Sequence, residues 1–158
     1  MNHFKNKKIL VTGGAGFIGS HLTKKLVQSK AKVSVVVKYN SLIDCPRLVN
    51  VWDKIKIIEA DLRNTDSVLS LKKLSFDYIF HFAAYNHVGD SFTHVTESIN
   101  SNLFSTINLF DHGPKFEKFI NIGSSEIYGL QKKLPFNVKE IPYPMSPYAL
   151  GKYSSALY

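Results

Sequence analysis

A tyrosine and a lysine near the end of the chain have the spacing needed to move a proton. Tyr148 and Lys152 are four residues apart, so a helix would place both side chains on one face. A phenol with an ordinary pKa of about 10 is a poor base, but a neighbouring ammonium group favours the phenolate. A phenolate held in this way can take the proton of a hydroxyl group near neutral pH. Because such a pair is usually an ordinary surface pair, its meaning depends on the rest of the chain.

A serine and a glutamate stand at a second position suited to chemistry. Residues 119–123 are an apolar run typical of a buried strand, and Ser124 and Glu126 come directly after it. Open α/β sheets carry their chemistry beyond the carboxyl ends of their strands. We therefore expect Ser124 and Glu126 at the reactive edge of a sheet.

A glycine-rich segment near the start of the chain is typical of a dinucleotide site. Gly13, Gly16 and Gly19 follow the apolar run at residues 9–11 and precede a helical pattern. In such a unit the first glycine permits a tight turn, the second lets the backbone approach a pyrophosphate, and the third lets the helix pack on the strand. The helix N-terminus adds a favourable field for the anion.

The elements that position these residues alternate along the chain. Apolar runs rich in β-branched and aromatic residues predict strands at 9–12, 33–37, 55–59, 78–82 and 119–123. Helical spacing falls at 18–29, 66–73 and 95–111, whereas residues 39–54 predict a loop with a short turn. This alternation predicts an α/β fold of the doubly wound, parallel-sheet Rossmann type, with all 158 residues in one dinucleotide-binding domain.

Composition narrows the classes further. The chain is 44% hydrophobic, and its longest apolar runs are far shorter than the ~20 residues of a membrane span. Cys45 is the only cysteine, which favours a reducing, cytoplasmic location, and its spacing from the six histidines predicts no metal site. The net charge of +8 is spread over short lysine pairs without a nucleic-acid motif, so we expect a solvated surface and no nucleic-acid partner.

Five sequence blocks in order resemble the extended short-chain dehydrogenase/reductase family of nucleotide-sugar epimerases and dehydratases. They are TGGAGFIG at 12–19, ADL at 60–62, HFAA at 81–84, SSEIYG at 124–129 and SPYALGK at 146–152. Members of this family continue with further strands and a C-terminal region that holds the sugar nucleotide. The resemblance therefore implies a Rossmann fold that is incomplete at the C-terminus, in a fragment, a piece made for expression or a truncated gene product.

The resemblance implies NADP or NAD as the cofactor. The second predicted strand ends without the acid that usually accepts the adenosine ribose in NAD sites. Lys38, Asn40 and Ser41 could hold a 2′-phosphate instead, so we favour NADP while NAD stays open. Asp61 matches the adenine-contacting acid of the family, although it could be only a turn residue. The other cofactor residues that the family implies are Gly13, Gly16, Phe17, Ile18, Gly19, Leu62, Phe82, Ala83 and Ala84.

The family also implies roles for the catalytic residues. Tyr148 would take the proton of the sugar C4 hydroxyl as hydride leaves C4, while Ser124 would bind that oxygen. Lys152 would bind the nicotinamide ribose and favour the tyrosine phenolate. Glu126 matches the base that removes the C5 proton in 4,6-dehydratases, although uronic-acid decarboxylases match it too, and a solvated loop carboxylate is the plain alternative.

The resemblance is closest to the 4,6-dehydratases, and residues 86–91 look like their loop, with His87 and Ser91 as substrate-binding residues. A 4-epimerase, a decarboxylase or a silent dinucleotide-binding module remain alternatives. Residues 37–41 resemble the branch that acts on UDP-N-acetylhexosamines. We expect a nucleotide-sugar substrate and no membrane partner. A homodimer is expected through helices around 95–111 and from 148 onward. The 158-residue chain by itself should bind the dinucleotide weakly and should not turn over a sugar nucleotide.

Overall fold

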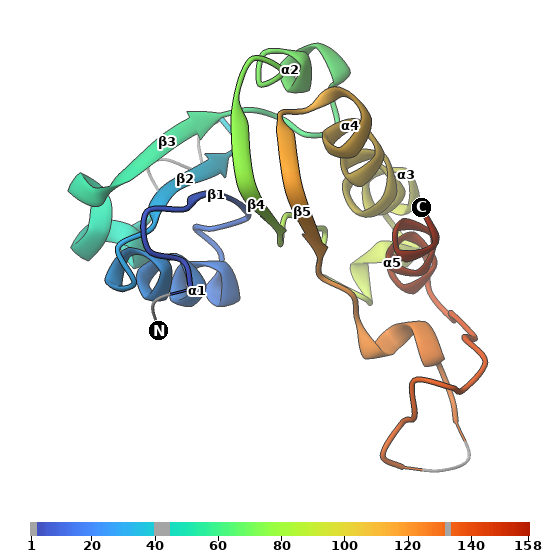
Figure 1. The fold of residues 1–158 in the computed structure, drawn as a ribbon. Helices are drawn as coiled ribbons and strands as arrows, with labels where there is room; N and C mark the ends of the chain where they lie inside the picture. The colour runs from blue at the N-terminus through green and yellow to red at the C-terminus, as the bar shows by residue number, and fades with distance from the viewer. Residues whose placement is uncertain (1–2, 40–44, 132–133) are drawn as a thin grey trace.

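The computed structural model describes residues 3–39, 45–131 and 134–158. In it five strands form one parallel sheet in the order β3-β2-β1-β4-β5, with helices on both faces (Figure 1). The strand order turns back between β1 and β4, which is where doubly wound sheets bind ligands. The predicted α/β Rossmann fold is confirmed. The strands are β1 (Lys8–Thr12), β2 (Lys32–Val37), β3 (Ile55–Glu59), β4 (Ser75–His81) and β5 (Lys115–Asn121).

The helical segments fill the connections between the strands. Three are 3-10 helices: η1 (Pro46–Lys54), η2 (Asp90–Phe92) and η4 (Ser125–Tyr128). The α-helices are α1 (Phe17–Gln28), α2 (Thr65–Leu69), α3 (Val95–Ile99), α4 (Ser105–His112) and α5 (Pro147–Leu157), with the π-helical segment η3 (Asn100–Phe104) between α3 and α4.

Both faces of the sheet carry a hydrophobic core, because successive strand residues point to opposite sides. In β1, Ile9 and Val11 pack toward α1 and η1, where Leu26 and Leu48 are buried. Leu10 points the other way, into a cluster that contains Val68 of α2 and Leu109 of α4. A sheet buried on both faces explains why the strands read as continuous apolar runs.

Two helical segments differ from the sequence prediction. The predicted loop at 39–54 contains η1, which buries Leu48 and Val51 against the core. The predicted helix at 95–111 is one continuous helical run through α3, η3 and α4, but its middle is π-helical, and there the side chain of Asn102 donates a hydrogen bond to the Tyr85 carbonyl at 3.0 Å. Asn102 is therefore a structural residue, and it ties the helix to the chain that leaves β4.

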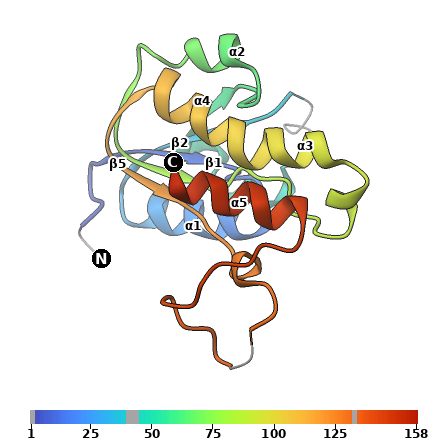
Figure 2. The same cartoon turned by 90° about the vertical axis from the view of Figure 1, so that its right-hand side faces the viewer.

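Helix α5 begins with a clear start signal. The Ser146 hydroxyl accepts a hydrogen bond from the Ala149 amide at 3.0 Å, and Pro147 occupies the first turn, where its missing N–H costs nothing. The helix packs against α3 and η3 (Figure 2). Between η4 and α5 the chain extends away from the sheet, as both views show (Figures 1 and 2). The cap thus fixes the helix that carries Tyr148 and Lys152.

Candidate active site

A cleft of about 620 Å³ lies at the carboxyl ends of the strands. The β1–α1 turn forms its middle. We call the part lined by Lys38, Asp61, Leu62 and Arg63 the β3 side, and the part lined by Ile122, Gly123, Tyr148 and Lys152 the β5 side. The cleft therefore joins residues from both ends of the chain at the switch point of the sheet.

The glycine turn in the middle of the cleft has no room for side chains at two positions. Gly13 has a φ of 63°, and a Cβ atom there would lie 2.7 Å from the amide nitrogen of Ala83. A Cβ atom on Gly19 would lie 2.3 Å from the Gly13 carbonyl oxygen. The turn can therefore bring bare backbone and the N-terminus of α1 to the cleft, which suits a pyrophosphate. Gly16, Phe17 and Ile18 also line the cleft here.

The β5 side holds the tyrosine–lysine pair. Tyr148 and Lys152 both line the cleft from α5, next to Ile122 and Gly123 beyond β5. Lys152 is 4% exposed, and burial lowers the pKa of its ammonium below the ordinary value. A buried cation with a depressed pKa beside a phenol is the arrangement that proton-transfer sites use.

Four of the predicted site residues are not among the residues that line the cleft. Ser124 caps η4, its hydroxyl accepting from the Glu126 amide at 3.2 Å, and the Glu126 side chain is exposed. His87 is exposed as well. Ser91 is fully buried, and its hydroxyl donates to the Val88 carbonyl at 2.6 Å. In this structure Ser124 and Glu126 come directly after the cleft residue Gly123. The Ser91 hydroxyl is used by its hydrogen bond to Val88 within the same turn.

Most of the predicted cofactor residues do line the cleft. Lys38 extends from the end of β2, and Asp61 and Leu62 follow β3. Phe82, Ala83 and Ala84 form the wall beyond β4. Asn40 and Ser41, which we expected near a 2′-phosphate, lie outside the residues that the structure describes.

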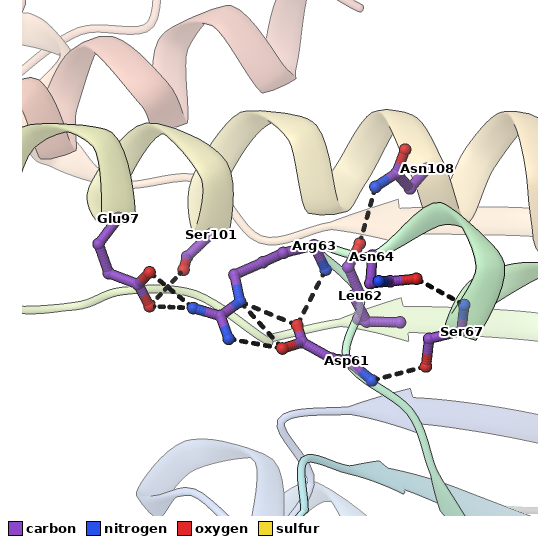
Figure 3. A network of polar contacts seen from close by, with 8 residues as sticks. All are labelled: Asp61, Leu62, Arg63, Asn64, Ser67, Glu97, Ser101 and Asn108. Carbon is purple, nitrogen blue, oxygen red and sulfur yellow. Dashed lines mark hydrogen bonds and ion pairs between the residues drawn. The ribbon is translucent and has the colours of Figure 1, made fainter.

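Arg63 and Glu97 are cleft residues that the sequence interpretation missed. Arg63 donates from Nε to Oδ1 of Asp61 at 2.9 Å and from Nη2 to Oδ2 at 2.5 Å (Figure 3). Its Nη1 contacts both carboxylate oxygens of Glu97, at 2.5 and 2.6 Å. The hydrogen bonds that Arg63 donates lower the pKa of Asp61, and the same bonds, to Asp61 and to Glu97, raise the pKa of Arg63. The three side chains thus form a charged bridge from the β3 side to α3.

A buried histidine at the end of β4 links β1 to α4. Nδ1 of His81 is 2.7 Å from the Thr12 hydroxyl, and Nε2 is 3.1 Å from the Thr106 hydroxyl. Thr12 accepts from the Ala83 amide and Thr106 donates to the Asn102 carbonyl, so the ring fits best with its proton on Nε2. Burial lowers the pKa of His81 to about 3, which keeps the ring neutral. His81 is a structural residue, as expected from its position at a strand end.

A parallel sheet with this strand order, a bare glycine turn and a Tyr–Lys pair in one cleft define a Rossmann domain of the short-chain dehydrogenase/reductase type. Residues 10–158 match the family model described as GDP-mannose 4,6 dehydratase. The chain therefore belongs to the extended short-chain dehydrogenase/reductase family of nucleotide-sugar epimerases and dehydratases, whose members are enzymes.

Individual relatives include both activities. The UDP-glucose 4-epimerase of Cyamopsis tetragonoloba is 35% identical, over 91% of this chain and 44% of the relative. The human dTDP-D-glucose 4,6-dehydratase is 32% identical, over 92% and 44%. The structure of a UDP-glucuronic acid 4-epimerase mutant from Bacillus cereus, in complex with UDP-4-deoxy-4-fluoro-glucuronic acid and NAD, matches with a TM-score of 0.80 at 30% identity. That match covers 95% of this chain and 50% of the epimerase. The chain spans about half the length of these relatives.

None of the helices within the described ranges is long and apolar enough to cross a membrane. Among the same residues, histidine, cysteine and acidic side chains do not gather in groups that could hold a metal ion.

Proposed function

We propose that this chain carries the cofactor-binding and proton-transfer residues of an NAD(P)-dependent nucleotide-sugar 4,6-dehydratase. The observation that carries the proposal is that Tyr148 and Lys152 of α5 line the same cleft as the glycine turn after β1. A dinucleotide whose pyrophosphate lies at this turn spans both sides of the cleft, which is the usual arrangement at a switch point.

The residues of the cleft fit such a dinucleotide. The turn at Gly13 and Gly19 offers bare backbone and the N-terminus of α1 for the pyrophosphate. Lys38 at the end of β2 offers a positive charge for a ribose 2′-phosphate, so we favour NADP over NAD. When bound, the nicotinamide supplies a reversible hydride acceptor for the sugar.

Tyr148 and Lys152 act at carbon 4 of the sugar. The phenolate of Tyr148 takes the proton of the C4 hydroxyl, and Ser124 donates a hydrogen bond to the same oxygen. Lys152 contributes in two ways, because its ammonium stabilises the phenolate and binds the adjacent ribose. Its burial strengthens both interactions, since the cleft around it excludes part of the water.

Glu126 is the residue that we propose to act at carbon 5 of the sugar. Oxidation at C4 makes the C5 hydrogen acidic, and Glu126 stands two residues beyond Ser124, at the start of η4. As the base at C5, Glu126 would remove the C5 proton, and this proton would leave with the C6 hydroxyl as water. C6 would then take back the hydride removed from C4 and C5 would take the proton held by Tyr148, so that the product is a 4-keto-6-deoxy sugar lighter by one water. His87 is proposed to face the sugar from the exposed loop after β4, with Ser91 supporting that loop through its bond to Val88. The UDP-N-acetylhexosamines are the substrates we favour.

A 4-epimerase is the second candidate, and the 35% identity to a UDP-glucose 4-epimerase favours it. The mass of the product separates the candidates. A dehydratase product is lighter by one water, a decarboxylase product is lighter by carbon dioxide, and an epimerase product keeps the substrate mass.

The experiment joins residues 1–158 to the matching C-terminal half of the human dTDP-D-glucose 4,6-dehydratase and analyses the product formed from dTDP-D-glucose by mass spectrometry, because the C-terminal half holds the sugar nucleotide. We expect loss of water, abolished by Tyr148→Phe and reduced by at least about a hundredfold in Glu126→Gln, in keeping with the loss of a general base. Glu140→Gln serves as the matched control. A product of unchanged mass, indifferent to Glu126→Gln, would favour the epimerase.

We also propose that the apolar side chains exposed on the outer helices form a homodimer interface. Phe104, Phe110 and Leu150 are each exposed by 45% or more on η3, α4 and α5. Exposed apolar clusters of this kind mark association surfaces. Sedimentation of the purified chain at increasing concentration tests the proposal, and Phe104→Glu should shift the protein to the monomer.

A further inference from the structure

Arg63 connects an acidic side chain of the cleft to a helix on the opposite wall. It binds both oxygens of Asp61 with Nε and Nη2, and both oxygens of Glu97 with Nη1 (Figure 3). The Ser101 hydroxyl lies 3.4 Å from Glu97 and marks the far end of the bridge. Arg63, Asp61, Glu97 and Ser101 all line the cleft, so the bridge forms part of its surface.

The loop after β3 is held in place without this bridge. The Asp61 amide donates to the Ser67 hydroxyl at 3.0 Å, and the Ser67 amide donates to the Asn64 side chain at 2.9 Å. The Asn108 side chain of α4 donates to the Leu62 carbonyl at 3.0 Å. These bonds fix the backbone of the loop, whereas the Arg63 side chain acts on the orientation and charge of the Asp61 carboxylate.

The position of Asp61 selects the part of the ligand that it meets. With the pyrophosphate at the β1–α1 turn and the nicotinamide beside Tyr148, the adenosine lies toward β2 and β3. An ionised carboxylate accepts hydrogen bonds, and the only N–H donor of adenosine is the amino group of the adenine ring. Two parallel bonds from the Arg63 side chain set the plane of the carboxylate. The Arg63 amide also donates to Oδ1 at 3.1 Å, so Oδ2 is the oxygen with a lone pair left for that donor.

We propose that Arg63 is a positioning residue that aims the Asp61 carboxylate at the amino group of adenine, and that Glu97 in turn holds Arg63. The inference rests on the proposed dinucleotide function. It predicts that the cleft discriminates between adenine and hypoxanthine, in which a carbonyl oxygen replaces the amino group. A carboxylate facing that oxygen is repelled, so the discrimination should be about tenfold or more.

The test measures binding of the dinucleotide and of its hypoxanthine analogue to the purified chain by calorimetry. Wild type should prefer the adenine form by about tenfold or more. In Arg63→Met the preference should fall to near unity, chiefly through weaker binding of the adenine form. Arg63→Lys, which cannot form the bidentate pair, and Glu97→Gln should give intermediate preferences. Arg47→Met, at an exposed arginine of η1, is the matched control.

Each outcome decides the matter. If Arg63→Met weakens both dinucleotides by the same factor or keeps the wild-type preference, Arg63 does not position Asp61 for the base. If it instead weakens NADP and its hypoxanthine analogue equally but spares NAD, Arg63 binds the 2′-phosphate and the inference is wrong. Failure of wild type to bind either dinucleotide overturns the proposed function itself. Thermal unfolding of each variant separates these results from a loss of fold.

Discussion

The β3 side and the β5 side of the cleft are built in different ways. On the β3 side, Asp61 is held by its amide, by both carboxylate oxygens and by the helix beyond, through Arg63 and Glu97. On the β5 side, Glu126 is exposed, and apolar side chains extend into solvent on the chain that follows η4. Leu130, Leu134, Val138 and Ile141 are each 79% exposed or more.

This difference indicates separate roles for the two sides, with proposed dinucleotide binding on the β3 side and proposed proton transfer on the β5 side. Hydrogen bonds and ion pairs already fix the groups of the β3 side, so the proposed binding of a dinucleotide there should need little reorganisation. The β5 side has its reactive pair on a capped helix, but the groups proposed to reach the sugar lie at an open rim. The β3 side is therefore preorganised by its own hydrogen bonds and ion pairs, whereas groups proposed for the chemistry on the β5 side are exposed to solvent.

The largest effect is expected where the two sides meet, at Gly13. Gly13→Ala forces a side chain into the left-handed region and places its Cβ 2.7 Å from the Ala83 amide nitrogen. Together the strain and the clash should cost about 3 kcal/mol of unfolding free energy. Dinucleotide binding should fall as well, because the turn must shift. Urea unfolding and calorimetry measure both effects.

Gly89→Ala is the matched control for this prediction, because a Cβ at Gly89 meets nothing within 4 Å. If the two alanine variants behave alike, the close approach of the turn to the β4 wall does not matter for stability.

The next largest effect is the pH dependence of the unfolding free energy that the buried His81 of β4 should cause. Burial lowers the pKa of His81 from 6.5 to about 3, so the folded protein keeps the ring neutral while the unfolded chain binds a proton. The stabilisation is complete above pH 6.5 and is lost progressively as the pH falls toward 3. Between pH 7 and pH 5 this group alone should remove about 2 kcal/mol of unfolding free energy. The measurement is urea unfolding at several pH values.

His81→Asn supplies the comparison. Its stability at pH 7 should be lower, but the part of the pH dependence due to His81 should disappear. An unchanged slope between pH 7 and pH 5 in the variant would show that His81 is not the group responsible.

Substitution of Lys152 tests whether this residue lowers the unfolding free energy of the free protein while it strengthens dinucleotide binding. Burial lowers the pKa of Lys152, which means that the folded protein disfavours its charged form. Lys152→Met should raise the unfolding free energy of the free protein by about 1 kcal/mol while weakening dinucleotide binding. Lys139→Met, at an exposed lysine, should do neither. A destabilised Lys152→Met would mean that the ammonium has a stabilising role in the free protein.

The smallest effect is expected at Glu126. Its side chain is exposed at the rim, so Glu126→Gln should change the unfolding free energy by less than about 0.5 kcal/mol. Dinucleotide affinity should also stay the same, because Glu126 is outside the residues that line the cleft. A clear loss of unfolding free energy or of dinucleotide affinity would mean that Glu126 has a structural or binding role, and the difference between the two sides would then be smaller than described here.

The five strands and the glycine turn of the cleft could be predicted because their signals are local. Apolar runs marked all five strands, and the short glycine segment marked the turn. The ends of β4 and β5 were less visible. β5 begins at Lys115, and the charged residues Glu117 and Lys118 hide its start, because a strand at the edge of this sheet exposes part of its surface.

The rest depended on contacts that sequence spacing does not reveal. Arg63 and Glu97 are separated by 34 positions, and only the folded chain brings them together. The π-helical segment η3 contains Asn102, whose side chain donates a hydrogen bond to the Tyr85 carbonyl. The apolar spacing of residues 95–111 predicts a helix but does not show that its middle is π-helical. η1 is a 3-10 helix with three residues per turn. Its residues therefore lack the 3.6-residue spacing of an α-helix, and the segment was predicted to be a loop.

The most direct test of the central claim is a calorimetric titration of the purified chain, residues 1–158, with NADP and with NAD. The account predicts saturable binding of one dinucleotide per chain, tighter for NADP because of Lys38, and lost in Gly13→Ala. Tighter binding of NAD would contradict the role of Lys38 and leave the preorganised cleft standing. Absence of binding by both dinucleotides would contradict the claim that this cleft is a dinucleotide site.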